Sequence, residues 1–243
     1  GVWKVPVMEN PQGTLKIQGG YNDDFSGRQP FGLPVRLQTV YGRDGAILQF
    51  EPRSTLRELV VSGLLMDAAP SNSYDVETNS LKKGESRHET LVTLGRMTSE
   101  RVIFADNIFL NGDRRAINLT WNPASTSAEV HLINNFFLNN LMALETKIYP
   151  NKISARGGRL VMRHNSFILN FPYNPDATSS NVGTIELYHR DSFRELVFER
   201  NLFAYNSGGV FQHDWPLDRM PEDITIRENL FFGNGALYGD GEA

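Results

Sequence analysis

The sequence lacks cysteine and contains only five histidines among its 243 residues. Without cysteine the chain has no disulfide scaffold, no cysteine-type zinc site and no thiol nucleophile. The histidines never take the H-x-x-x-H spacing of a metal-binding pair, and the acidic residues form no clear Asp cluster. We therefore predict no resident cofactor or metal, with calcium as the one cofactor left open.

The sequence also lacks a basic tract and a long apolar run. Its net charge is −4 and the basic residues are dispersed, which argues against nucleic acid as a partner. No apolar stretch approaches the length that a membrane span requires, and the first ten residues, GVWKVPVMEN, do not have the pattern of a signal peptide. The expectation is a soluble chain with no membrane span.

The second half of the chain repeats one phrase five times. Each copy has a short apolar strand, an Asn, an aromatic residue two positions later, and then a second Asn or a small turn. The copies are VIFADNIFLN (102–111), VHLINNFFLN (130–139), LVMRHNSFILN (160–170), LVFERNLFAYN (196–206) and ITIRENLFFGN (224–234). The first Asn of each copy, here called the marker Asn, falls at Asn107, Asn135, Asn165, Asn201 and Asn229, with spacings of 28, 30, 36 and 28 residues. Such a period is typical of a solenoid.

The residues of each copy indicate how it folds. Apolar side chains five and three positions before the marker Asn alternate with other residues, as in a half-buried β-strand. We expect the marker Asn itself to turn the chain, because Asn tolerates unusual backbone angles. The next inward positions are Phe109, Phe137, Phe167, Phe203 and Phe231. Coils stacked about 4.8 Å apart would align these residues into an Asn ladder and a Phe stack.

Two of these stretches, RNLFAYNSGGVFQ (200–212) and ENLFFGNGALY (228–238), resemble the coils of right-handed parallel β-helix proteins of the pectate-lyase-like superfamily. The resemblance extends from Leu56 to the C-terminus, with residues 59–66 as a degenerate first copy. The opening LKIQGGYNDDFSGRQP (15–30) resembles the stretch that precedes the coils in many secreted bacterial β-helix proteins. The resemblance implies an all-β, single-stranded right-handed parallel β-helix with an extracellular, periplasmic or cell-surface location.

The remaining segments suggest a capped solenoid. Residues 1–53 are predicted to form a strand-rich N-terminal cap, with strands at 14–17, 35–39 and 46–50, because a solenoid needs an end that covers its first apolar coil. Residues 54–243 then form one continuous stack of coils. Residues 67–89 and 172–180 are polar and lack a pattern, and we predict that both are inserted loops.

The outward positions beside the marker Asn provide a first candidate site, made of Arg163, His164, Glu199 and Arg200. Two interpretations remain open. Opposite charges one coil apart can simply stabilise the stack, at about 0–1 kcal/mol for an exposed pair. Alternatively, these four residues form a catalytic acid-base surface. A polysaccharide lyase needs a base for the proton beside a uronic carboxylate, and a cation that neutralises that carboxylate.

A second candidate surface follows the strand that precedes each repeat. The segments AINLTWN (116–122), TKIYPN (146–151), TIELYHRD (184–191) and VFQHDW (210–215) each carry an aromatic residue near their end. On successive coils of one face these aromatics would form a row on which sugar rings stack, with polar groups beside it. The candidate substrate-binding residues are Trp121, Tyr188, His189, Arg190, His213, Asp214 and Trp215. The alternative is that Trp121 and Tyr149 point inward or pack under loops.

The sequence leaves three classes of function open. We expect a secreted or cell-surface protein that binds a polysaccharide or other glycan along one face, with catalysis undecided. The first alternative is a lyase, hydrolase or epimerase that acts on acidic glycans, since the superfamily it resembles includes such enzymes. The second alternative is a non-binding structural spacer or adhesin. The oligomeric state is left open.

Overall fold

A computed structural model describes residues 3–38, 46–69, 74–75, 80–81, 90–112, 115–148, 158–170, 183–188, 193–206, 209–213 and 221–235. Throughout these residues every regular element is a β-strand, and no helix is long and apolar enough to span a membrane. Twenty of the 22 strands belong to two large parallel sheets of 13 and 7 strands. The remaining two, β7 (Tyr74–Asp75) and β8 (Ser80–Leu81), pair antiparallel with each other.

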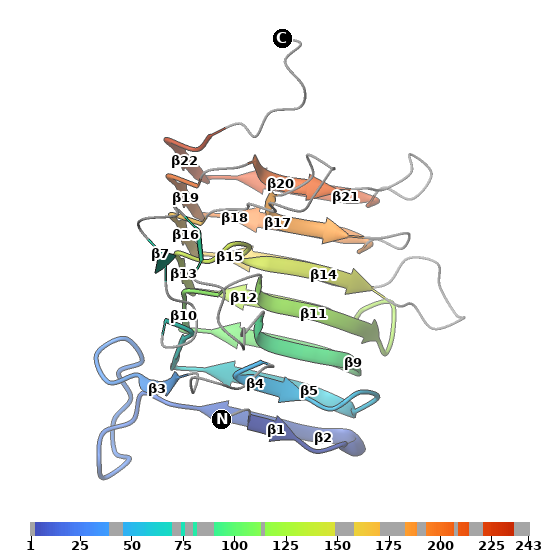
Figure 1. Cartoon of the computed structure of the whole chain (residues 1–243). Coiled ribbons are helices and arrows are strands. Elements are labelled where there is room, and N and C mark those ends of the chain that lie inside the picture. The colour runs from blue at the N-terminus through green and yellow to red at the C-terminus, as the bar shows by residue number, and fades with distance from the viewer. Residues whose placement is uncertain are drawn as a thin grey trace.

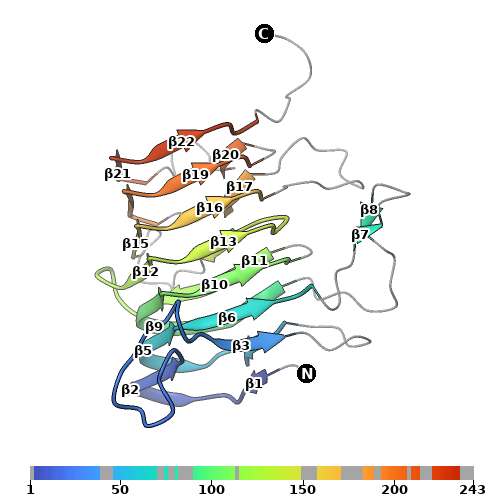
Figure 2. The ribbon, with the colours of Figure 1, turned by 90° about the vertical axis from the view of Figure 1, so that its left-hand side faces the viewer.

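The parallel strands form three rows, and the chain visits the rows in turn (Figures 1 and 2). Row 1 contains β1 (Trp3–Val5), β4 (Leu48–Phe50), the first half of β9 (Thr90–Ala105), β11 (Arg115–Pro123), β14 (Leu144–Ile148), β17 (Gly183–Tyr188) and β20 (Gly209–His213). Row 2 contains β2 (Glu9–Gln18), β5 (Thr55–Ser62), the second half of β9, β12 (Glu129–Ile133), β15 (Arg159–Arg163), β18 (Glu195–Glu199) and β21 (Asp223–Arg227). Row 3 contains β3 (Val35–Gln38), β6 (Leu64–Asp67), β10 (Ile108–Leu110), β13 (Phe136–Leu138), β16 (Ser166–Ile168), β19 (Leu202–Ala204) and β22 (Leu230–Phe232).

We call one strand from each row, in chain order, a coil. Because β9 runs through both row 1 and row 2, these two rows join into the 13-stranded sheet, and row 3 is the 7-stranded sheet. The predicted all-β class is confirmed, and the large, curled parallel sheets are compatible with a parallel β-helix or solenoid.

The strands predicted near the N-terminus are present, and they belong to the same rows as the repeats. β1, β2 and β3 pair in parallel with β4, β5 and β6, so residues 3–38 contribute the first strand of every row. The division between cap and coils at residue 53 stays a prediction. On either side of it, β4 and β5 both pair with β9. Of the two predicted loops, 172–180 lies outside the described residues, and only short pieces of 67–89 fall within them.

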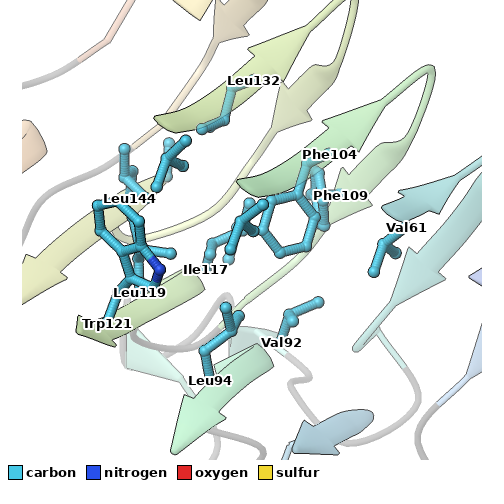
Figure 3. Packing of buried hydrophobic residues seen from close by; sticks show 14 of the residues in the cluster. Val61, Val92, Leu94, Phe104, Phe109, Ile117, Leu119, Trp121, Leu132 and Leu144 are labelled. Carbon is cyan, nitrogen blue, oxygen red and sulfur yellow. The ribbon is translucent and has the colours of Figure 1, made fainter. Parts of the chain in front are cut away.

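The predicted Phe stack runs through the interior behind row 3. Successive rings from Phe109 to Phe203 are 4.7–4.8 Å apart, with interplanar angles of 6–12°. Phe231 extends the stack with a centroid distance of 5.0 Å from Phe203. Aliphatic side chains from rows 1 and 2 pack in the same core, as the close-up in Figure 3 shows around Phe104 and Phe109. The core is therefore continuous along the stack, and each coil is buried by its two neighbours.

The predicted Asn ladder is also present, and it is buried. The Oδ1 atom of Asn135 accepts hydrogen bonds from the backbone N and the Nδ2 of Asn107, at 3.1 and 3.0 Å. The same pair of bonds recurs at each later step as far as Asn229. Each Nδ2 also donates to a carbonyl of the preceding coil, as Asn165 does to Leu132 O at 2.8 Å. Each ladder amide from Asn107 to Asn201 thus satisfies buried polar groups on both sides, which a buried amide requires.

A second ladder lies five residues further along each copy. It starts at the backbone N of Gly112, which donates to Asn140 Oδ1 at 2.9 Å, and continues through Asn170, Asn206 and Asn234. In the first two copies the ladder position is one residue beyond the Asn that ended the repeated phrase. Those earlier residues, Asn111 and Asn139, bond to each other on the surface at 2.6 Å.

The prediction that the marker Asn turns the chain is wrong by one residue. The residues with left-handed backbone angles, φ between 54° and 57°, are Asp106, Asn134, His164, Arg200 and Glu228, each directly before the marker Asn. The second ladder has the same arrangement, with positive φ at the residue before each rung. The turn and the ladder use different residues because the residue that turns the chain points outward, whereas the ladder amide must point inward to bond with its neighbours.

The Phe stack predicts a large effect of truncation on stability. Phe167→Ala should lower the free energy of unfolding by about 3–5 kcal/mol, because it opens a cavity between two stacked rings. Denaturant melts measure this directly. Phe31→Ala is the matched control, since Phe31 is 47% exposed, and it should cost much less. Equal costs for the two variants would contradict the central role of the stack.

The ladder predicts a second effect. Asn165→Ala removes the acceptor of two Asn135 donors and the donor to Leu132 O, so it should cost about 1–3 kcal/mol through unpaired buried groups. Asn118→Ala is the control, because the half-buried Asn118 side chain accepts a hydrogen bond from Thr120 Oγ1 in the same strand and does not belong to the ladder. Thermal and denaturant unfolding of both variants would separate a ladder Asn from an Asn on the outer face.

Candidate functional site

The four segments of the second predicted surface do fall on successive coils of one face. They correspond to β11, β14, β17 and β20, which are consecutive neighbours in row 1. Ile117, Leu144 and Ile185 are in register and buried, and they form the inward column. The next column faces outward and contains Asn118, Glu145, Glu186 and Gln212. The segments were therefore aligned correctly from the sequence.

The aromatic row predicted on this face needs correction at Trp121. The Trp121 side chain is 0% exposed and lies among the core residues (Figure 3). Its Nε1 donates to Ser99 Oγ at 2.9 Å, and its ring stacks on Phe193. A methyl group added at Gly158 would lie 2.7 Å from the Trp121 ring, so the surrounding backbone fits closely around it. Trp121 is a core residue and cannot stack on a sugar. Strand alternation carried this signal, because Trp121 has the same parity as the inward Ile117 and Leu119.

The other predicted binding residues lie at or beyond the ends of β17 and β20. The backbones of Tyr188 and His213 pair with Lys147 and Leu187, and for these two residues only the backbone is described. His189, Arg190, Asp214, Trp215 and Tyr149 lie outside the described residues. Their assignment to a binding surface stays a prediction.

The structure adds a charged cluster on row 1 that the sequence did not reveal. Glu145 is buried although it faces outward, and its Oε1 accepts a hydrogen bond from Arg115 Nη2 at 2.8 Å. Lys147 Nζ lies 3.1 Å from the same oxygen. In register with Glu145, on the next coil, is Glu186, which is half-buried. Two carboxylates and two cations thus lie close together on the outer face of row 1.

The cluster was difficult to find from the sequence. Arg115 and Glu145 are 30 residues apart, close to the repeat spacing, which is the one available signal. Glu186 is a further 41 residues on, because the chain between β14 and β17 carries extra length, and that displaces it from any regular period.

The first predicted site, at the corner between rows 2 and 3, is brought together as expected. Arg163 and Glu199 are in register on β15 and β18, with Arg163 Nε 2.9 Å from Glu199 Oε2. His164 and Arg200 follow them, both exposed and both at left-handed turn positions. Arg227, which was not among the predicted site residues, lies on the far side of Glu199, with its Nη2 2.7 Å from Oε1.

The electrostatics of this corner favour an ion-pair ladder over proton transfer. Glu199 is only 5% exposed. Its burial acts to raise the pKa, but the hydrogen bond and charge of Arg227 and the charges of Arg163 and Arg200 outweigh burial, so the pKa of Glu199 lies below its ordinary value. A carboxylate held in this way accepts a proton less readily, so it suits a general base poorly. Arg200 also forms an ion pair with Glu228 on the next coil.

Row 2 carries a second ion-pair ladder of the same kind. Arg159 lies between Glu129 and Glu195, with N···O distances of 3.5 and 3.0 Å. The His131 ring Nε2 lies 2.9 Å from Glu129 Oε2. Burial acts to raise the pKa of Glu129, but His131 and Arg159 together lower it. Charges on this face therefore neutralise one another from coil to coil.

Comparison with protein-family models, curated proteins and solved structures found no match to this chain. Within the described residues, no group of three or more His, Asp or Glu side chains is placed to hold a metal ion. The functional interpretation therefore depends on the two faces described above, the polar row 1 and the ion-paired corner beside row 2.

The pKa of Glu199 predicts an acid effect on stability. Because its folded pKa is below the ordinary 4.5, Glu199 contributes stability above that pH and loses it as the pH falls through the lower folded value. Between about pH 5 and pH 3 the melting temperature of Glu199→Gln should fall less than that of the parent chain. Glu9→Gln, at an exposed position on β2, is the control and should follow the parent.

Proposed function

We propose that this chain is a single-stranded right-handed parallel β-helix that binds a polysaccharide along the outer face of row 1. The handedness is supported by the near-universal right-handed sense of parallel crossover connections. The likeness of residues 200–212 and 228–238 to pectate-lyase-like coils supports the same fold and a secreted or cell-surface location.

The observation that carries the binding proposal is the outward column of row 1, in which Asn118, Glu186 and Gln212 are half-buried and Glu145 between them is buried. These side chains repeat along the stack at the spacing of parallel strands, about 4.8 Å. A repeating polar surface suits a polymer that is itself a repeat and lies along the axis of the stack. Asn and Gln offer both donors and acceptors, as sugar hydroxyls do. Thr120 and Lys147 add a second polar column beside the first.

A second candidate function is catalysis on an acidic glycan at the same face. The observation that favours it is the placement of Glu145 and Glu186 on adjacent coils, since glycoside hydrolysis uses paired carboxylates. Arg115 and Lys147 would supply the cations that neutralise a uronic carboxylate. Glu199 is the other catalytic candidate, and there two arginines hold the carboxylate as Arg115 and Lys147 hold that of Glu145. A structural spacer or adhesin is the remaining class if no glycan binds.

The binding proposal predicts a loss of affinity on row 1. The double variant Asn118→Ala/Thr120→Ala should weaken polysaccharide binding about tenfold, the scale of one or two hydrogen bonds, and leave the melting temperature nearly unchanged. The matched control removes the same residue types from row 2, as Asn10→Ala/Thr225→Ala, and should bind like the parent. A glycan array identifies the polymer, and titration calorimetry then measures the affinities.

The same glycans separate the candidate functions. Each bound acidic polysaccharide is incubated with the parent chain while the absorbance of unsaturated products and the release of reducing ends are followed. Product formed by the parent and lost in Glu186→Gln would establish catalysis on row 1. Binding without product supports the binding proposal alone. A chain that binds nothing on the array, or whose two double variants bind equally, contradicts the proposed face.

A further inference from the structure

The last described coil exposes side chains at positions that are buried in the coil before it. Ile224, Ile226 and Phe231 are 41%, 54% and 46% exposed. The residues in register with them one coil earlier, Leu196, Phe198 and Phe203, are at most 2% exposed. The same inward columns therefore end in an apolar surface at the C-terminal end of the stack. We call this surface, formed by β21 and β22, the end face.

Both Asn ladders also end at this face with donors left over. At each earlier step the backbone N and the Nδ2 of one rung donate to Oδ1 of the next rung, as Asn201 does to Asn229 at 2.9 Å for both bonds. Asn229 Nδ2 donates one hydrogen bond to Phe198 O, and Asn234 Nδ2 donates one to Phe203 O, both on the preceding coil. Among the described residues, no further rung accepts from their remaining donors.

The backbone is open at the same place. Within the part of the chain that the structure describes, each of β20, β21 and β22 is the last strand of its row and pairs on one side only. An unpaired parallel edge is a template for the addition of another strand. Here Asn229, Phe231 and Asn234 lie along the edge in fixed register. An added strand must therefore carry matching residues at three defined positions.

We propose that the end face binds an extended segment that carries the pattern Asn-x-Phe-x-x-Asn, added as one more coil. The first Asn of the segment accepts from Asn229, its Phe stacks on Phe231, and its second Asn accepts from Asn234. Apolar residues three and five positions before the first Asn cover Ile226 and Ile224. The four interactions lie in the register that every earlier coil uses.

The N-terminal end of a second copy does not fit this requirement. Its first two coils have no Asn in the ladder columns, because Leu64 stands where the marker Asn would be and donates its backbone N to Asn107 Oδ1. The second ladder likewise begins only at Gly112. Stacking of copies head to tail would leave the Asn229 and Asn234 donors unmatched, so the occupant is a segment with Asn at both rungs.

The test uses the whole chain and a synthetic peptide that copies its own preceding coil, residues 193–206. Fluorescence anisotropy of the labelled peptide measures binding to the parent chain. We expect saturable binding that weakens at least tenfold when the peptide carries Asn201→Ala and Asn206→Ala. In the chain, Ile226→Asp should abolish binding, while Ile103→Asp, on the outer side of row 2, should leave it unchanged.

Other results would overturn the proposal. They are a parent peptide that does not bind, a peptide with both Asn residues replaced that binds equally well, and binding that survives Ile226→Asp. Sedimentation velocity of the chain alone provides one more check. A dimer that dissociates with Ile226→Asp but is insensitive to Asn229→Ala would show an apolar contact between copies in place of ladder-directed addition. These readouts do not involve glycan, so they are independent of the function proposed for row 1.

Discussion

The rest of this structure depends on the buried amide ladder. An amide placed in an apolar interior is costly unless all of its donors and acceptors are used, and here each rung uses both ends of the side chain. The ladder therefore permits one register only, because a slip of one residue would bury unpaired amides and move every apolar side chain to the opposite face. The Phe stack adds apolar burial, but aromatic rings alone would tolerate more than one alignment. The apolar core as a whole contributes stability, and the amides contribute uniqueness.

The register set inside also determines the outside of the molecule. Because coils are aligned at the ladder, the outward residues are aligned as well, and charges separated by about thirty residues become neighbours. The arrangement of Arg159 between two glutamates and of Glu199 between two arginines follows from this. Most such pairs are partly exposed, and each contributes little by itself. Their larger consequence is that row 2 presents a neutralised surface, whereas row 1 presents a mixed polar column suited to contact with a polymer.

A stack buried only by its neighbours has two ends that differ in chemistry. At the N-terminal end the first coils lack ladder residues, and Arg28 fastens the segment before β3 to the second coil through Ser62 Oγ at 2.8 Å. At the other end the repeat continues unchanged to its last described coil, with donors, apolar side chains and strand edges all presented together. The same feature that makes the interior regular makes this end selective, since what binds there must supply the missing half of each interaction.

The sequence by itself determined the repeat, the strands, the two kinds of inward column and the alignment of the row 1 segments, because all of these follow from local alternation and a regular period. It also implied the ion pairs at Arg163 and Glu199, whose spacing matches that period. Three features were decided only by the tertiary structure. The left-handed turn lies at the residue before the marker Asn, because the amide must point inward. The partners of Trp121 are the second feature, because alternation places this side chain inward but only the folded chain brings its ring onto Phe193 and its Nε1 to Ser99 Oγ. Glu145 and Glu186 are neighbours, because unequal lengths of chain between coils place them together, and no period in the sequence records that distance.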